Sequence, residues 1–451
     1  MEDSLRPFFD SLARSRDSAA RAPRALLSDT AANLQWFALF QDTVLQKLVE
    51  TAVRENRDVR VAVATIEEFR AEYGVARGPL FPQLDVTAQA GKEKIIFGGT
   101  QPFTFNVFNV AGNVAWELDF WGRLRRSAQA ARADLLAQEA NERAVVLSLV
   151  SDVAVAYLQL RQLDLNLEIA RQTLASRQRT LQLATRRYSQ GLISELDVRQ
   201  FEAEVADPAA RVADFERQIA QLENQLSVLL GHHPGPIPRG RSLPDVLSTI
   251  DIPAGLPSQL LERRPDVRAA EQSLAAATAR IGVAQGARFP RFTITGQYGS
   301  QSTELSRLLG RNTDTYQLFF GISLPLFTGG QLSNDVRAAR ARAEQARYRY
   351  EQTVLQALQD VEDALAAVRS GRDQVVAQQT QVNALQRALH LATERYEEGV
   401  SSYLDVLDAQ RSLFTAQLAL TQAQLQALVD AVQLYKALGG GWTTEGGPPE
   451  R

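Results

Sequence analysis

The sequence of 451 residues contains no cysteine, which excludes a disulfide framework, a thiolate zinc site and a thiol nucleophile. No uninterrupted run of 18 apolar residues occurs, so we expect no transmembrane helix. The formal net charge is only -3, so the chain lacks the basic character of a nucleic-acid-binding protein. The segment up to about Thr30 is polar and has no apolar core of the kind found in a secretory leader. These absences direct attention to the patterning of the remaining residues.

The second half of the chain repeats the first, because position n resembles position n+208 with almost no gaps. A solenoid repeat spans about 20–50 residues, so this longer period indicates one large unit duplicated within the chain. We expect the two repeats to form one intertwined fold, with a short tail at each end. The expected ranges are 1–33 for the first tail, 34–241 for the first repeat, 242–441 for the second repeat and 442–451 for the last tail. The matching segments include Gly74-Val75-Ala76 with Gly282-Val283-Ala284, Phe81-Pro82 with Phe289-Pro290, and Leu196-Asp197-Val198 with Leu404-Asp405-Val406.

Long heptad patterns predict helices in both repeats. Every seventh residue from Val146 to Tyr188 is apolar, and so is every seventh residue from Val354 to Tyr396. A repeat of about 3.5 residues sustained over this length is typical of supercoiled helices with a narrow apolar seam. Ordinary core packing explains most of these positions.

A glycine interrupts each heptad pattern, and a second heptad pattern follows it. Gly191 and Gly399 stand where a glycine relieves the left-handed turn after a helix end. We therefore predict antiparallel helical hairpins over 124–230 and 331–438. Pro208 lies on the seam of the first returning helix and should kink it, because proline lacks an N–H. Its counterpart is Ala416 (208 + 208), so the second hairpin should be straighter.

Alternation of period two predicts strands ahead of each hairpin. From Phe108 to Phe120 the even-numbered residues are apolar or glycine, and the odd-numbered residues are small or polar. Strands are expected over about 83–96, 105–120, 290–300 and 315–327. Strands of this kind match those of outer-membrane barrels, which face lipid on one side and water on the other. A soluble antiparallel sheet with one buried face fits the same alternation.

The number of strands decides what a membrane protein of this pattern requires. Two strands per repeat give four per chain, whereas the smallest membrane barrels close with about eight. An open sheet edge is not tolerated in lipid, so the chain would have to oligomerise. Two, three or four copies would supply 8, 12 or 16 strands, and about 12 or more would leave a water-filled bore.

Three motifs resemble one family. The stretch from Leu256 to Val267, which contains Arg263-Arg264-Pro265-Asp266, resembles the signature of the outer membrane factor family, the TolC-like group. Residues 116–123, Trp-Glu-Leu-Asp-Phe-Trp-Gly-Arg, resemble the motif after the second strand in its NodT/OprM-type branch. Residues 395–411 resemble the second hairpin turn of that branch. The similarity extends from about Trp36 to Gly439.

The resemblance implies the outer-membrane channel of a tripartite efflux pump. It implies a homotrimer, in which long antiparallel coiled-coil hairpins form an α-barrel and four strands per chain contribute to a 12-stranded transmembrane β-barrel. The implied partners are outer-membrane lipid, a periplasmic adaptor and an inner-membrane pump, and the channel itself would be passive. The implied location is the bacterial outer membrane, extending into the periplasm. Neither a signal peptide nor the acylated cysteine of many family members occurs in this sequence.

The resemblance also implies a periplasmic gate at the second hairpin turn. Leu404, Asp408 and Arg411 have the spacing i, i+4, i+7, which places them on one helix face, and Tyr396 lies across the turn. In the family, matching positions form an apolar constriction with carboxylate–arginine contacts. An exposed i,i+3 ion pair without a gating role is the alternative. The equivalent residues of the first repeat are Leu196, Gln200 and Ala203, so the charged pair occurs in one hairpin only.

The residues of the two turns are candidate contacts for the adaptor, and plain turn chemistry is the alternative. These residues are Gly191, Leu192, Gly399, Val400 and Ser401.

Other functional classes find little support in the sequence. No phosphate-binding loop, nucleophile elbow or pair of catalytic carboxylates is present, so we expect no enzyme and no cofactor. His232 and His233 lie in a Pro/Gly-rich linker, and we expect no metal site there. The competing interpretation is a soluble coiled-coil scaffold with a small sheet. Such a scaffold would have to cover the apolar strand face from Phe108 to Phe120.

Overall fold

The computed structural model describes residues 40–97, 101–248, 264–310 and 312–440. The expected tails and the part of the family motif before Arg264 lie outside these residues. The described chain is mainly helical with one four-stranded antiparallel sheet, which confirms the predicted fold class. Contacts divide the chain into two compact units, and each unit contains segments of both repeats. Unit 1 extends to Val61 and includes 143–265 and everything from Leu355, whereas unit 2 comprises 62–142 and 266–354.

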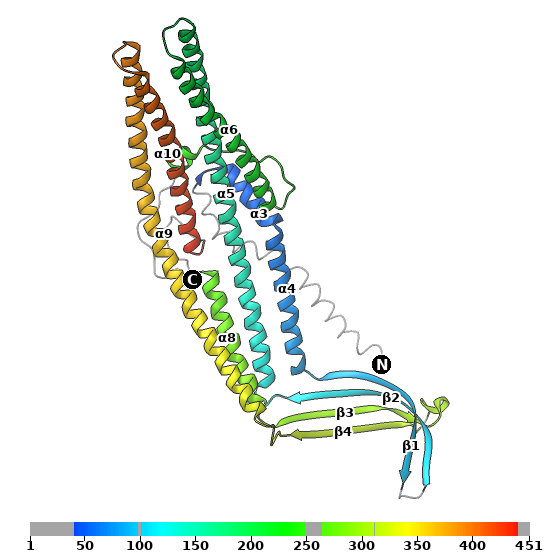
Figure 1. The fold of residues 1–451 in the computed structure, drawn as a ribbon. Helices are drawn as coiled ribbons and strands as arrows, with labels where there is room; N and C mark the ends of the chain where they lie inside the picture. Colours follow the sequence, from blue (N-terminus) through cyan, green and yellow to red (C-terminus); the bar gives the residue numbers. More distant parts are fainter. Residues whose placement is uncertain (1–39, 98–100, 249–263, 311, 441–451) are drawn as a thin grey trace. The chain divides into compact units, whose positions relative to one another are not determined.

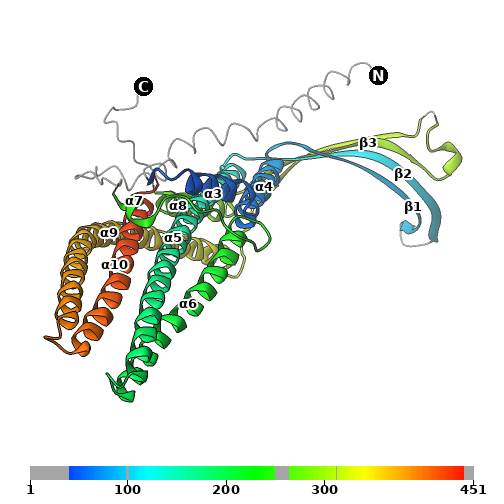
Figure 2. The ribbon, with the colours of Figure 1, turned by 90° about the horizontal axis from the view of Figure 1, so that it is seen from above.

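Unit 1 contains the greater part of two antiparallel helical pairs, α5–α6 and α9–α10, whose turns lie at the same end (Figures 1 and 2). The first parts of α5 and α9, up to Glu142 and Val354, belong to unit 2. The paired helices match their counterparts in length, with 67 residues in α5 and α9 and 35 residues in α6 and α10. Each helix of the second pair begins and ends 208 residues after its counterpart in the first. The helices are α5 (Arg123–Ser189), α6 (Glu195–Leu229), α9 (Gln331–Glu397) and α10 (Tyr403–Ala437), together with α3 (Thr43–Glu55) and α7 (Leu243–Leu247).

The core of unit 1 forms where α5 passes the other helices, and Tyr157, Leu158 and Leu160 have no exposed surface. One buried carboxylate, Asp42, organises this region. Its side chain accepts from the amides of Val44 and Leu45 at 2.8 and 3.2 Å, from the Tyr157 hydroxyl at 2.9 Å and from another backbone amide at 3.0 Å. The carboxylate therefore caps α3 and joins it to α5.

Helix α5 departs from the expectation that the chain has no membrane-spanning helix. By length and composition alone, part of α5 is apolar enough to cross a membrane, and it is the one described helix of this kind. Most of that apolar segment is buried, as in the core helix of a soluble protein. The heptad seam spreads its apolar residues among polar ones, which is why a search for unbroken apolar runs misses it.

The two repeats keep one backbone contact while changing the side chain that makes it. Asn56 donates from Nδ2 to the carbonyl of Leu229, the last residue of α6, at 2.9 Å. Arg264, at 56 + 208, donates from Nη1 to the carbonyl of Ala437, the last residue of α10, at 3.0 Å. Arg264 also pairs with Asp360 at 2.8 Å. The signature arginine thus satisfies a carbonyl that a helix end leaves without an intrahelical donor.

Unit 2 contains the sheet, whose strands follow one another in the order β1-β2-β3-β4 with antiparallel pairing throughout. Figure 1 shows β2, β3 and β4 side by side. Most of α8 (Pro265–Gly286) and most of α4 (Arg57–Arg77) belong to the same unit. The strands are β1 (Gln83–Phe97), β2 (Gln101–Leu118), β3 (Arg291–Ser302) and β4 (Asp314–Ser323).

The largest differences from the expected strand ends are at the start of β2 and the end of β4. β2 begins at Gln101 rather than 105, because its first residues pair with β1 alone, and β3 joins only from Phe108. β4 ends at Ser323 rather than 327. Pro325 follows, and a proline cannot donate to the sheet ladder.

The motif at residues 116–123 forms the junction between β2 and α5. The Glu117 carboxylate accepts from Nε and Nη2 of Arg123 at 2.8 to 3.3 Å, and the Asp119 carboxylate accepts from the first amides of α5 at 2.8 and 3.1 Å. Trp121 stacks on Phe289 at 4.8 Å and donates to the carbonyl of Pro290 at 2.8 Å. The motif therefore stops the strand, caps the long helix and ties it to the start of β3.

Candidate functional site at the hairpin turns and the sheet face

The two hairpin turns have the same backbone design. Gly191 and Gly399 adopt φ of +72° and +74°, and no atom lies within 4 Å of where a Cβ would stand at either position. Glycine is therefore required by the left-handed backbone and not by crowding. The amides of Leu192 and Val400 close the turns by donating to carbonyls five residues earlier, at 2.9 and 2.8 Å. Turn chemistry thus accounts for both glycines.

Apolar side chains at both turns are open to contact. Leu192 is 67% exposed and Val400 is 65% exposed. The Ser401 hydroxyl is shielded from solvent, and within the described residues it has no hydrogen-bond partner. The structure therefore places the five predicted adaptor contacts at the outer ends of the hairpins, with two exposed aliphatic side chains among them.

Just inside the turns, a cluster of aromatic side chains joins all four helices. Arg187 of α5 donates to the Tyr396 hydroxyl of α9 at 2.6 Å, and its guanidinium lies 5.5 Å from the Tyr396 ring. The Tyr403 ring of α10 meets the Tyr396 ring edge-on at 4.9 Å and the Phe201 ring of α6 at 4.4 Å. Burial raises the pKa of Tyr403 to about 12. Of the predicted gate residues, Tyr396 joins this cluster, whereas Leu404 is 52% exposed.

A cavity of about 310 Å³ lies between the hairpins beside this cluster. Its wall is more apolar than polar, and residues of both hairpins contribute to it. The lining residues include Leu183, Arg187, Ile193, Asp197, Gln200, Phe201, Tyr396, Tyr403 and Leu404.

The predicted charged pair is present, but it is not the main contact of Arg411. Asp408 and Arg411 approach only to 3.7 Å, and their side chains are 77% and 57% exposed. The main partner of Arg411 is Glu204 of α6, whose Oε1 accepts from Nε at 2.6 Å. This hydrogen bond raises the pKa of Arg411. Glu204 is 7% exposed and also pairs with the buried Arg177 of α5 at 2.9 Å. One carboxylate therefore links α10 of the second repeat to both helices of the first.

Sequence reasoning missed Arg187, Phe201, Glu204 and Tyr403. A signal for the buried ion pair was present, because Arg177 is the one charged residue in the seam series from Leu149 to Ala184 taken every seventh position. A charge on an apolar seam needs a partner. Its identity depends on which helix packs opposite.

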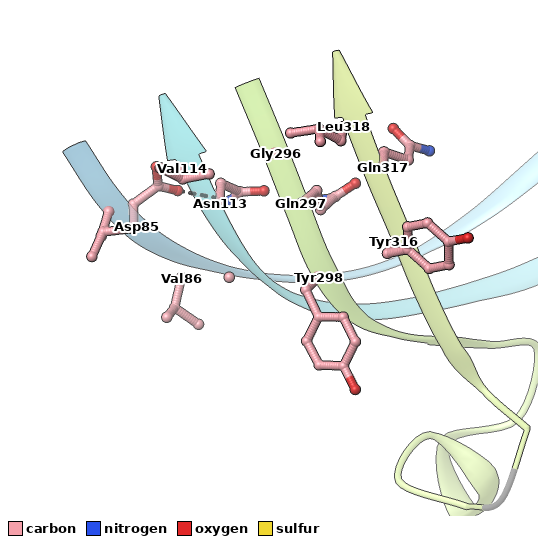
Figure 3. A pocket seen from close by; sticks show the side chains of 12 residues that line it. Asp85, Val86, Asn113, Val114, Gly296, Gln297, Tyr298, Tyr316, Gln317 and Leu318 are labelled. Atoms are coloured by element: carbon pink, nitrogen blue, oxygen red, sulfur yellow. Dashed lines mark hydrogen bonds between the residues drawn. The ribbon is translucent and has the colours of Figure 1, made fainter. Parts of the chain in front are cut away.

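Unit 2 presents an apolar sheet face with little cover. The register places Val114 opposite Leu84, and Tyr298 opposite Tyr316, on one face. Tyr316 is 81% exposed and Phe320, further along the same face of β4, is 75% exposed. The face carries an open groove of about 580 Å³ (Figure 3), lined by residues that include Leu84, Val86, Gly112, Val114, Gly296, Tyr298, Tyr316 and Leu318.

The opposite face carries a polar cluster on β1 and β2, although Phe319 of β4, on the same face, is 60% exposed. The Asn113 side chain donates to Asp85 at 2.8 Å (Figure 3) and to Thr87 at 3.2 Å. Around Asn113 the two faces therefore differ as the alternation predicts. Within the part of the chain that the structure describes, no group of three or more His, Asp or Glu side chains is arranged to hold a metal. His232 pairs instead with Glu55 at 3.0 Å.

Paired long helices, an internal duplication and a sheet with one exposed apolar face define a class of membrane channel proteins. The model of the family described as outer membrane efflux protein matches residues 48–232 and again 256–440. The two matches begin and end 208 residues apart, which is the period of the sequence repeat. The chain belongs to the outer membrane efflux protein family, and it is an outer-membrane efflux channel.

Individual relatives agree with this assignment. The chain is 37% identical to the solvent efflux pump outer membrane protein SrpC of Pseudomonas putida over 409 residues, which cover 90% of this chain and 87% of that protein. It is 34% identical to the cation efflux system protein CusC of Escherichia coli, over 92% of this chain and 90% of that protein. Among solved structures, the MtrE outer membrane channel of Neisseria gonorrhoeae in its open state matches with a TM-score of 0.81 and 36% identity, over 89% and 90% of the two chains.

Proposed function

We propose that three copies of the chain assemble into a passive exit duct for substrates delivered by an inner-membrane pump through a periplasmic adaptor. The observation that carries the proposal is the incomplete sheet. Four strands leave β1 and β4 as edges, and lipid tolerates no unpaired edge. Three copies would close a barrel of 12 strands, wide enough for an aqueous bore. We infer no catalytic activity for such a duct.

The exposed apolar face supports the lipid-facing side of this barrel. A soluble scaffold would leave Tyr316, Phe320 and Ile322, which are 71% to 81% exposed, in contact with water. In a barrel these side chains would meet lipid, and the polar face with Asp85 and Asn113 would line the bore.

The hairpin turns are the proposed gate and adaptor surface. Tyr396, Leu404, Asp408 and Arg411 would narrow the inner end of the duct. The links from Tyr396 to Arg187 and from Arg411 to Glu204 support this role, because each holds the second hairpin to the first. The five turn residues named above would meet the adaptor. We further propose that the ranges 34–241 and 242–441 descend from one duplicated unit.

Single-channel recording tests the gate. The double variant Asp408→Ala with Arg411→Ala should raise conductance in a planar bilayer, because it removes the charged link at the inner end. A matched control removes Arg199 and Glu202, another exposed i,i+3 pair at 2.9 Å, and should leave conductance unchanged. Unchanged conductance in the Asp408 and Arg411 variant would refute the gate.

A further inference from the structure

Helix α6 contains a proline that does not end it. The helix runs from Glu195 to Leu229, with Pro208 buried in its interior. Proline has no N–H, so the carbonyl four residues earlier, that of Glu204, loses its helical donor. Glu204 is 6% exposed, so water has little access to replace that donor. A buried carbonyl without a partner is costly, and the chain must supply another donor.

Arg177 of the neighbouring helix α5 supplies it. Its Nη1 donates to the Glu204 carbonyl at 2.7 Å and pairs with the Glu204 carboxylate at 2.9 Å. The Arg177 side chain is 4% exposed; both of these polar contacts are to Glu204, and its guanidinium also lies 5.6 Å from the Phe414 ring of α10. The two contacts with Glu204 have different roles. The carboxylate balances the positive charge of the guanidinium, and the carbonyl accepts a hydrogen bond from it.

The second repeat lacks all three parts. Position 385 (177 + 208) is leucine, position 412 (204 + 208) is serine and position 416 (208 + 208) is alanine. Helix α10 runs through position 416 with an ordinary residue that has an N–H. The chain therefore has a proline with an arginine donor in one hairpin, and neither in the other.

We propose that Arg177 is a positioning residue required by Pro208. It replaces the missing backbone donor, closes the gap in the α6 hydrogen-bond ladder and fixes the Glu204 carboxylate where Arg411 of the second hairpin binds it. The proposal concerns the backbone of α6 and does not depend on the channel function. The alternative is that Arg177 acts only as the counter-ion of Glu204, and that its contact with the carbonyl is incidental.

The two roles separate in a double-mutant cycle. Arg177→Leu and Pro208→Ala, singly and together, give each position the residue of the second repeat. Hydrogen exchange of the amides at 202–211 in the full-length detergent-solubilised protein reports local opening of α6. Arg177→Leu alone should speed exchange there about tenfold or more, because the Glu204 carbonyl loses its donor. In the Pro208→Ala background the same change should have a much smaller effect, because the restored N–H serves that carbonyl.

Controls keep the experiment decisive. Amides of α8, which lies almost entirely in unit 2, take no part in these contacts and should exchange alike in all variants. Arg177→Lys keeps a charged donor and should restore slow exchange in part, which provides a readout if Arg177→Leu does not fold. Equal acceleration in the Pro208 and Pro208→Ala backgrounds, by either Arg177 variant, would overturn the proposal in favour of the counter-ion role. No acceleration in either background would overturn it as well.

Discussion

Replacing Glu204 by glutamine should destabilise unit 1 far more than removing Arg411, although the two residues share one ion pair. Glu204→Gln keeps the size of the side chain and removes its charge. It leaves Arg177, only 4% exposed, as a buried cation without its carboxylate. Arg411→Ala removes a partner that is 57% exposed and leaves Glu204 still paired with Arg177.

The magnitudes follow from burial. Removing one member of a buried ion pair costs about 3–5 kcal/mol, because the remaining charge stays desolvated. An exposed partner contributes about 1 kcal/mol or less, since water screens it and replaces it. We therefore expect the free energy of unfolding to fall by about 3–5 kcal/mol for Glu204→Gln and by about 1 kcal/mol or less for Arg411→Ala.

Denaturant unfolding of the purified protein in detergent, followed by the circular dichroism of the helices, measures both changes. Glu202→Gln is the matched control, because Glu202 lies on the same helix with a 46% exposed side chain. It should cost about 1 kcal/mol or less. Equal losses for Glu204→Gln and Arg411→Ala, or a harmless Glu204→Gln, would show that burial of the Arg177 pair does not control the stability of this region.

Three further outcomes are expected. Asp42→Ala should cost about 2–4 kcal/mol, because it removes a helix cap and leaves buried donors without an acceptor, whereas Ser194→Ala at an exposed cap should cost about 1 kcal/mol in the same denaturant assay. The folded protein holds the Tyr403 proton more tightly than the unfolded chain, so the free energy of unfolding should keep its full Tyr403 contribution below pH 10 and lose it as the pH rises towards 12. In a pH series of unfolding curves, Tyr403→Phe should remove about 1–2 kcal/mol of that loss. Phe320→Arg on the apolar sheet face should reduce the yield of membrane-inserted protein, at a cost of about 2–4 kcal/mol, whereas Gln317→Arg on the opposite face should insert normally; equal yields would argue against lipid contact.

The sequence predicted the elements well because each depends on a local period. Heptads gave hairpins over 124–230 and 331–438, and the structure has them from Arg123 to Leu229 and from Gln331 to Ala437. Strand positions were predicted from the alternation of apolar and polar residues, and they differ from the structure mainly at the strand ends. There, a proline or the absence of a neighbouring strand determines where the pairing stops. The kink expected at Pro208 stays a prediction, since α6 continues through it.

Contacts between segments far apart in the sequence could not be predicted from the periodicity of single helices and strands. The i,i+3 spacing of Asp408 and Arg411 identified a charged pair, but the stronger partner of Arg411 is Glu204, 207 residues earlier. Likewise Tyr396 was predicted at the gate, yet its partner Arg187 lies across from it on the other hairpin. Which side chains meet depends on how two hairpins pack, and no period along one helix encodes that.

Asn56 and Arg264 occupy equivalent positions of the two repeats, so each repeat shows what a different side chain does at the same helix end. In the second repeat Asp360 pairs with Arg264, and the first repeat has an aspartate, Asp152, at the equivalent position (152 + 208). A neutral amide satisfies the same carbonyl in the first repeat, so the contact can survive a complete change of chemistry. At these two helix ends the repeats keep the carbonyl that needs a donor and differ in the side chain that supplies it.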